Sequence, residues 1–488
     1  MNLNSNNNFF SIKTLVYGIL LASVFIIPIL IIKFGIAYSL IYSLIPAVLI
    51  YLVVVMSNPY WGLVIIFIFN YFIMGITRYI PIQGGIAIDM LIITTILGVV
   101  IQTINGKIHW IRIKSPLILL SGIWLLYCIL ELLNPEAVSQ IAWATTIRGV
   151  AGYFVLISVL TMLLFDRFKD LKWIIFAWGV FTLLAVIKAF MQKTFGFDYA
   201  ETKWLNEGAW RQHIIFSGIR YFSFYTDAGN FGSGMGYSMV VFSIISFYVK
   251  QRNLKIFYMI VAVSAAAAMM ISGTRGALAV PFAGYALFTI LSKNFKMAFV
   301  TFVALLAVFL FLKFTYIGES NSFIRRMRTA VNLNDESLLT RLDNQKKLRV
   351  YLADKPFGAG IGLGGGKARE FLPNAYLSHI PTDSWFVMLW VETGIVGLIL
   401  NIIILFYIIA YSSFMVMFRI EDRELRGYIT ALTCGVIGII ATSYGNEVLG
   451  QFPTAFLVYM SMAFMFKSKK LDAEIRRRRL INEYKEQA

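Results

Sequence analysis

The apolar residues of this chain form blocks of about 20, the length that a helix needs to cross the hydrocarbon core of a bilayer. Only helices and closed barrels cross a membrane, because lipid cannot satisfy the backbone N–H and C=O groups. Barrel strands would alternate polar and apolar residues, and these blocks do not alternate. We therefore predict an all-α fold, a polytopic bundle of transmembrane helices.

Composition and charge support this prediction. The chain has 488 residues, of which 59% are hydrophobic and 14% are charged, whereas a soluble domain carries about 25% charged residues. The formal net charge of +18 would suggest nucleic acid as the partner of a soluble protein. In a membrane protein, basic residues accumulate in the cytoplasmic loops. We therefore expect the lipid bilayer as a partner and no nucleic acid.

We predict fourteen spans, or twelve if one of the two weakest pairs is lost. The weak points are the tight hairpin at 273–275 and the last two blocks. The predicted spans are 14–33, 37–56, 60–77, 86–104, 116–134, 146–165, 171–190, 229–249, 255–273, 275–292, 296–314, 384–411, 427–445 and 452–467.

The distribution of Lys and Arg orients these spans. The tail 467–488 holds eight of them and is predicted to be cytoplasmic. An even number of spans then places the N-terminus on the same side. The charges of successive loops support this orientation. The loops predicted inside are basic, and the short loops predicted outside are poor in Lys and Arg. We predict a multi-pass membrane protein with both termini in the cytoplasm.

Two segments on the outer side are too long to be simple connections. Their aromatic residues argue against disorder. The predicted organisation is a bundle at 1–315 with an outer loop at 192–228, a large extracytoplasmic loop at 316–383, C-terminal spans at 384–467, and a basic cytoplasmic tail at 468–488.

Cytoplasmic anchoring explains 23 of the 43 Lys and Arg residues. Arg148, Arg220 and Arg275 are not explained, because they lie at or near the outer ends of spans. A charged side chain at the bilayer is costly, and such a residue is a functional candidate by default. The alternative is that these arginines snorkel to lipid phosphate.

The large outer loop contains a predicted helix at 338–354. Projected at about 100° per residue, Arg341 and Arg349 fall on the same face as several leucines. Arginines on an apolar face require a buried anionic partner. The alternative is an ion pair with a loop carboxylate such as Asp335 or Glu336.

The glycine-rich run at 356–366 does not meet the pattern of a phosphate-binding loop, because Lys367 is followed by Ala368. It is either a flexible turn or a close backbone approach to a ligand. Asp383 follows at the predicted membrane boundary. This carboxylate could be a general base near the arginines, or the N-cap of the next helix, and the two roles can coexist. The two cysteines and three histidines do not have the spacing of a disulfide or a metal site.

Four stretches together resemble the O-antigen ligase and polysaccharide polymerase superfamily. They are the residues around Ile86–Asp89, Arg220–Asn230, Ser272–Ala277, and Arg341–Leu398 with its Pro-Phe-Gly-Ala-Gly-Ile-Gly run and Glu-Thr-Gly pattern. The resemblance spans roughly residues 80–410, and it rests on the order and the outer location of these motifs rather than on any single one.

This resemblance implies a metal-independent glycosyltransferase of the bacterial inner membrane, without a cofactor. It would act at the outer face of that membrane, on an oligosaccharide carried by a polyprenyl diphosphate. Polymerases join repeat units of O-antigen, capsule or exopolysaccharide, whereas ligases transfer the chain to lipid A-core. By position, Arg220, Arg275 and Arg341 resemble the arginines expected to bind the diphosphate. Arg349 precedes Gly360 with a spacing that resembles one found in some polymerases, and Arg148 is a further candidate.

The resemblance favours a polymerase. Ligases of this superfamily usually carry His-Asn nine residues before the Glu of Glu-x-Gly, whereas this chain has Asp383-Ser384 there, with His379 four residues earlier. Asp383 is the predicted catalytic residue and His379 its substitute. A ligase, a transporter of lipid-linked saccharide, or a scaffold within an export complex are the alternatives. A chain-length regulator or a flippase is the expected protein partner.

Overall fold

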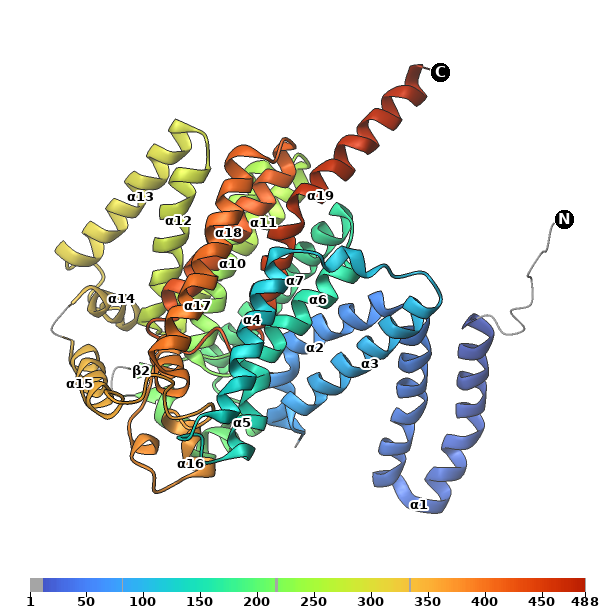
Figure 1. Ribbon diagram of the computed structural model, residues 1–488, viewed down its shortest axis with the longest axis horizontal. Coiled ribbons are helices and arrows are strands. Elements are labelled where there is room, and N and C mark those ends of the chain that lie inside the picture. Colours follow the sequence, from blue (N-terminus) through green and yellow to red (C-terminus); the bar gives the residue numbers. More distant parts are fainter. Residues whose placement is uncertain (1–11, 81, 216–217, 333–334, 488) are drawn as a thin grey trace. The chain divides into compact units, whose positions relative to one another are not determined.

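The computed structural model describes residues 12–80, 82–215, 218–332 and 335–487, and nearly all of its regular structure is helical (Figure 1). The first half contains α1 (Ile12–Ser57), α2 (Pro59–Tyr79), α3 (Gly84–Ile104), α4 (Pro116–Leu130), α5 (Gln140–Ile147), α6 (Tyr153–Leu164), α7 (Phe168–Phe195), α8 (Tyr199–Trp204) and α9 (Trp210–His213). The second half contains α10 (Ala228–Tyr248), α11 (Arg252–Ile271), α12 (Ala279–Leu291), α13 (Phe295–Phe314), α14 (Ser322–Arg328), α15 (Glu336–Tyr351), α16 (Ala368–Phe371), α17 (Trp385–Phe418), α18 (Arg423–Thr442) and α19 (Thr454–Gln487).

The two strands, β1 (Ile214–Ile215) and β2 (Gly218–Ile219), pair antiparallel in a short hairpin that the sequence did not predict. Short turns of 3₁₀ or π-helix complete the regular structure: η1 (Trp110–Ile113), η2 (Glu131–Leu133), η3 (Arg148–Gly152), η4 (Leu205–Ala209), η5 (Arg275–Leu278), η6 (Thr329–Val331), η7 (Gly365–Lys367) and η8 (Tyr376–His379).

The predicted all-α membrane fold is confirmed. Within the described residues, ten helices are long and apolar enough to cross a membrane. The remaining predicted spans coincide with shorter or longer apolar helices. α1 covers both of the first two, η5 with α12 covers the span after the 273–275 hairpin, and α19 begins with the last one.

The chain divides into two compact units. The first comprises 1–69 with 83–112, and here α1 packs against α3. Gln102 of α3 donates to the carbonyl of Met56 at 2.6 Å. A Cβ at Gly98 would lie 2.6 Å from the carbonyl oxygen of Val55. A small residue here permits the close helix approach that is typical of membrane bundles.

The second unit comprises 70–82 with 113–488, and α10 is its central helix. α10 packs against α11, α12 and α18, and these helices lie side by side in Figure 1. The first turns of α10 are rich in glycine, and a Cβ at Gly232 would lie 2.3 Å from the hydroxyl of Ser272. These close approaches bring the N-terminal end of α10 against the hairpin that carries Arg275.

The two ends of this unit differ in character. α14, α15, α16 and β2 gather at one end, whereas the C-terminal part of α19 projects from the other (Figure 1). At the α19 end, Lys467 pairs with Asp166 at 3.1 Å, and Arg476 pairs with Glu421 at 3.0 Å. The basic tail therefore meets loops that the sequence assigns to the same side as the tail. The orientation in the membrane itself stays a prediction.

α17 has a sharp kink at Gly394, whose φ of 66° and ψ of −173° suit glycine. The segment 356–366, named here the glycine strap, fits into this kink. Ala359 and Gly360 donate backbone hydrogen bonds to Val391 and Glu392 of α17, at 2.8 and 3.0 Å. Of the two alternatives for this run, the flexible turn is wrong, because residues 358–365 are buried and the backbone N–H groups of Ala359 and Gly360 bond to α17.

Candidate functional site

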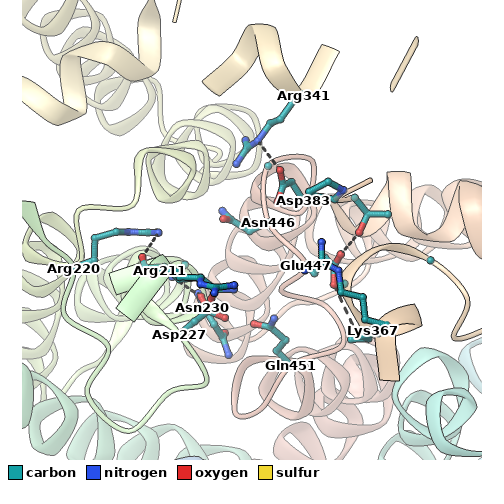
Figure 2. A pocket seen from close by; sticks show the side chains of 18 of the residues that line it. Arg211, Arg220, Asp227, Asn230, Arg341, Lys367, Asp383, Asn446, Glu447 and Gln451 are labelled. Carbon is teal, nitrogen blue, oxygen red and sulfur yellow. Dashed lines mark hydrogen bonds and ion pairs between the residues drawn. The ribbon is translucent and has the colours of Figure 1, made fainter. Parts of the chain in front are cut away.

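A cavity of about 790 Å³ opens at the end of the second unit that holds α14–α16 (Figure 2). Three segments far apart in the sequence form it. They are the stretch from Arg211 to Asn230, the large loop from Arg341 to Asp383, and the connection between α18 and α19 with Asn446 and Glu447. The sequence places all three segments on the outer side.

A second cavity of about 600 Å³ adjoins the first, and Arg220, Arg341 and Asn446 line both. Arg275 and Arg326 line the second cavity as well. These four arginines are named here the arginine cluster: Arg220, Arg275, Arg326 and Arg341. Arg220 and Arg341 lie at the junction of the two cavities, and the second cavity also has the apolar lining residues Leu278 and Phe282.

Arg220 follows the β1–β2 hairpin and reaches across to the 272–275 turn. Its guanidinium donates to the carbonyl of Gln212 at 3.0 Å and to the hydroxyl of Thr274 at 2.9 Å. Its Nε is buried and finds no hydrogen-bond partner among the described residues. Burial lowers the pKa of Arg220, and the neighbouring cations Arg275 and Arg341 lower it further. A site that collects this much positive charge suits an anionic ligand.

Arg275 and Arg326 form the part of the cluster that lines only the second cavity. Arg275 pairs with Asp335 and donates to the hydroxyl of Thr329 at 3.0 Å. The predicted ion pair with Asp335 therefore exists, but Arg275 makes it. Burial lowers the pKa of Arg326 to about 10, with Arg220 and Arg275 contributing. Arg326 was not predicted from the sequence, although it lies in a loop predicted to be outside, where cytoplasmic anchoring does not explain basic residues.

Arg341 lies where the two cavities meet, with its Nε 3.9 Å from a carboxylate oxygen of Asp383 (Figure 2). The side chain of Asp383 is 48% exposed, so it can contact a ligand in the larger cavity. The prediction that Asp383 is the N-cap of the next helix is wrong. Ser384 caps α17 by accepting from the backbone of Val387, and Asp383 has a φ of 50°.

A second carboxylate faces the same cavity. Glu447 accepts a hydrogen bond from the hydroxyl of Thr382 at 2.5 Å and lies 3.9 Å from the ammonium of Lys367. Thr382 precedes Asp383, so the two carboxylates flank one short segment. Glu447 and Asn446 were not predicted from the sequence as site residues. The available signal was their position together in a short polar stretch between two predicted spans.

The start of α10 forms the floor of the larger cavity. Asp227 caps the helix by accepting from the backbone of Gly229 and Asn230, at 2.6 and 3.0 Å. Asn230 donates to the carbonyl of Phe452 at 2.6 Å. Both bonds use Oδ1 of Asp227, and Oδ2 accepts from the hydroxyl of Thr226 at 3.3 Å. The exposed carboxylate of Asp383 is therefore better placed to accept a proton from a ligand.

Three predicted site residues do not line either cavity within the described residues. Arg148 begins the π-turn η3 inside the span Gln140–Leu164. His379 is exposed at the end of η8, and Arg349 is exposed on the outer face of α15. The predicted apolar face of this helix is only partly correct. Leu348 and Leu352 are buried, but Leu342 is 40% exposed, and Arg349 requires no buried partner.

The described residues hold no group of three His, Cys, Asp or Glu that could bind a metal ion. The chemistry available in the cavities comes instead from guanidinium groups, carboxylates and an ammonium group. Such a set can bind phosphate, accept a proton and hydrogen-bond sugar hydroxyls.

Comparison with known proteins gives two matches. Residues 260–402 match the O-Antigen ligase family, a segment that runs from α11 to the middle of α17 and contains Arg275, Arg326, Arg341 and Asp383. An O-antigen polymerase of Salmonella muenchen is 30% identical over 140 residues, which is 28% of this chain and 34% of that protein. The chain thus matches about a third of the relative's length. The resemblance to the O-antigen ligase and polymerase superfamily is thereby confirmed for this segment.

Proposed function

We propose that this chain is a membrane glycosyltransferase of the O-antigen ligase and polymerase type. It would join lipid-linked saccharides at the outer face of the bacterial inner membrane. The observation that carries the proposal is the arginine cluster, which lines two adjoining cavities, with the carboxylates of Asp383 and Glu447 lining the larger of them. The match over residues 260–402 supports the proposal, because that segment supplies three of the four arginines.

The two cavities suit two parts of a lipid-linked saccharide. The cavity with Arg275 and Arg326 would hold the diphosphate, because guanidinium groups bind phosphate oxygens through paired, charge-assisted hydrogen bonds. Its apolar wall, with Leu278 and Phe282 of η5 and α12, suits the adjoining polyprenyl chain. The larger polar cavity would hold sugar residues.

In the proposed reaction, a hydroxyl oxygen of the acceptor saccharide attacks the anomeric carbon of the donor. The bond between that carbon and the diphosphate oxygen breaks, and the polyprenyl diphosphate leaves with the electron pair. The arginine cluster stabilises the charge that develops on the leaving group. Asp383 accepts the hydroxyl proton, and Arg341 holds its carboxylate toward the junction of the cavities.

Polymerisation is the favoured form of this reaction, with a growing chain transferred to the next repeat unit. The curated relative is an O-antigen polymerase. His379, the candidate for a ligase-like histidine, is exposed and lies outside both cavities. Ligation to lipid A-core is the second candidate, since the matching family is described as O-Antigen ligase.

The test is turnover by the purified protein in lipid nanodiscs, with a repeat unit on polyprenyl diphosphate as donor. Two acceptors are compared: a second lipid-linked repeat and lipid A-core. A ladder of longer lipid-linked chains supports a polymerase, and transfer to lipid A-core supports a ligase. No product with either acceptor would overturn the proposal.

Variants test the residue roles in the same assay. Arg275→Ala and Asp383→Ala are expected to lose turnover, whereas Arg252→Ala is expected to keep it. Arg252 is an exposed residue at the start of α11, in a loop predicted to be cytoplasmic. Unchanged turnover in both Arg275→Ala and Asp383→Ala would contradict the roles assigned to these residues, but not the resemblance to the superfamily.

A further inference from the structure

Arg78, at the end of α2, lies outside both cavities and yet is tied to the turn that carries Arg220. Its guanidinium carbon lies 4.5 Å from the ring centroid of Trp204 and 4.4 Å from that of Phe222. From this position it donates to the backbone carbonyls of Ser223, at 2.5 Å, and Tyr225. An arginine that snorkels to lipid phosphate would not make these contacts.

The two carbonyls belong to the turn 220–227, which places Arg220 at one end and Asp227 at the other. Ser223 sits at the centre of this turn with a φ of 51°, a conformation that non-glycine residues seldom adopt. Its hydroxyl donates to the carbonyl of Ala185 at 2.7 Å, and its N–H donates to Gln192 at 3.0 Å. The turn is therefore held in a strained form by bonds from its surroundings, and Arg78 supplies two of them.

Phe222 also connects Arg78 to the backbone of Arg220, through His213. The rings of Phe222 and His213 have their centroids 4.5 Å apart. The N–H of Arg220 donates to the carbonyl of His213 at 2.8 Å. Burial lowers the pKa of His213 to about 4, so its ring is neutral at neutral pH and adds no positive charge beside Arg78. A continuous set of contacts thus runs from Arg78 through Phe222 and His213 to Arg220.

We propose that Arg78 is a positioning residue for the arginine cluster: it fixes the 220–227 turn, and thereby the guanidinium of Arg220, without touching the substrate. This inference rests on the proposed function for its catalytic consequence. The geometry that it claims, a turn held by Arg78, is independent of that function.

The catalytic consequence is tested by a double-mutant comparison of turnover. Arg78→Ala is expected to reduce kcat/KM on the order of 10²-fold, the effect of moving a binding group by about 1 Å. If Arg78 acts through Arg220, adding Arg78→Ala to Arg220→Ala causes no further loss. Losses that multiply in the double variant would overturn the inference. Arg78→Lys provides the same comparison if Arg78→Ala does not fold, since an ammonium group keeps the charge but not the fork of donors.

The geometric claim is tested without any turnover. Arg220→Cys places a thiol on the turn in a chain whose two native cysteines are buried. Its rate of modification by a charged thiol reagent is expected to change severalfold when Arg78→Ala is added. Arg252→Ala, the control, is expected to leave that rate unchanged. Equal rates with and without Arg78 would overturn the inference. Absence of glycosyl transfer in the wild-type protein would overturn only the proposed function.

Discussion

Replacing Gly394 with alanine tests how the kink in α17 builds the site. Gly394 adopts a φ of 66° with a ψ of −173°, a region of backbone conformation that is almost restricted to glycine. A Cβ there would lie 1.9 Å from the carbonyl oxygen of Pro356 in the glycine strap. Because the closest atoms belong to the backbone, a side-chain rotation cannot relieve the overlap. The strap must move away from α17.

The cost follows from what that movement breaks. The strained backbone of a non-glycine residue costs roughly 1–3 kcal/mol. The displaced strap loses the backbone hydrogen bonds from Ala359 to Val391, from Gly360 to Glu392 and from Val396 to Pro356. Each contributes about 1 kcal/mol. We therefore expect Gly394→Ala to lower the free energy of unfolding by about 5 kcal/mol, a large part of the stability of a typical protein.

The assay is the fraction of monodisperse protein that survives stepwise heating in detergent. The matched control is Gly122→Ala in α4, where nothing lies within 4 Å of the added Cβ. The control is expected to change stability by no more than about 1 kcal/mol. If Gly394→Ala survives heating as well as Gly122→Ala, the strap does not brace the kink, and the reasoning is refuted.

Three further predictions concern the site and its surroundings. Arg341→Ala should weaken binding of a short-chain polyprenyl diphosphate by about 10- to 100-fold, because a charged hydrogen bond contributes about 1.5–3 kcal/mol. Arg341→Lys should restore little of this affinity. Equal affinity for the two variants and the wild-type protein would contradict the prediction. Ser384→Ala should lower the free energy of unfolding by about 1 kcal/mol, because Ser384 is the N-cap of α17. Asp383→Asn should leave it unchanged. A lower thermal midpoint for Asp383→Asn than for Ser384→Ala would show that Ser384 is not the cap. His213 has a folded-state pKa of about 4, below its ordinary value of 6.5, so the unfolded chain binds more protons between these values. Stability should therefore be complete above about pH 6.5 and fall toward pH 4, and His213→Phe should remove this dependence in a pH series of thermal unfolding.

The spans were predictable because a bilayer imposes one length and one composition on every helix that crosses it. Most predicted spans coincide with single helices. The predicted tight hairpin at 273–275 is also present, and it joins α11 to η5 and α12. The 220–227 turn and the glycine strap followed no such rule. Their conformations depend on Arg78, Gly394 and other partners distant in the sequence.

The candidate site was partly predictable for the same reason. Arg220 and Arg275 stood out because cytoplasmic anchoring does not explain basic residues at the predicted outer ends of spans, and Arg341 because it falls on the leucine face of a predicted loop helix. The structure brings all three to one pair of cavities. Arg148 met the first criterion and Arg349 the second, and both lie elsewhere. Charge and predicted sidedness indicate which surface of the protein carries the candidate site. They do not indicate which side chains on that surface lie close together.

The sequence by itself determined that the chain is a helical membrane protein with basic residues that predicted cytoplasmic anchoring does not explain. Hydrophobic length and charge are properties of single segments, so they can be read without knowing any contact. The tertiary structure alone decided that Arg326 and Glu447 line the cavities of the candidate site, that Ser384 rather than Asp383 caps α17, and that Arg78 donates to the backbone of the 220–227 turn. These outcomes depend on which helix ends meet, and packing between distant segments settles that.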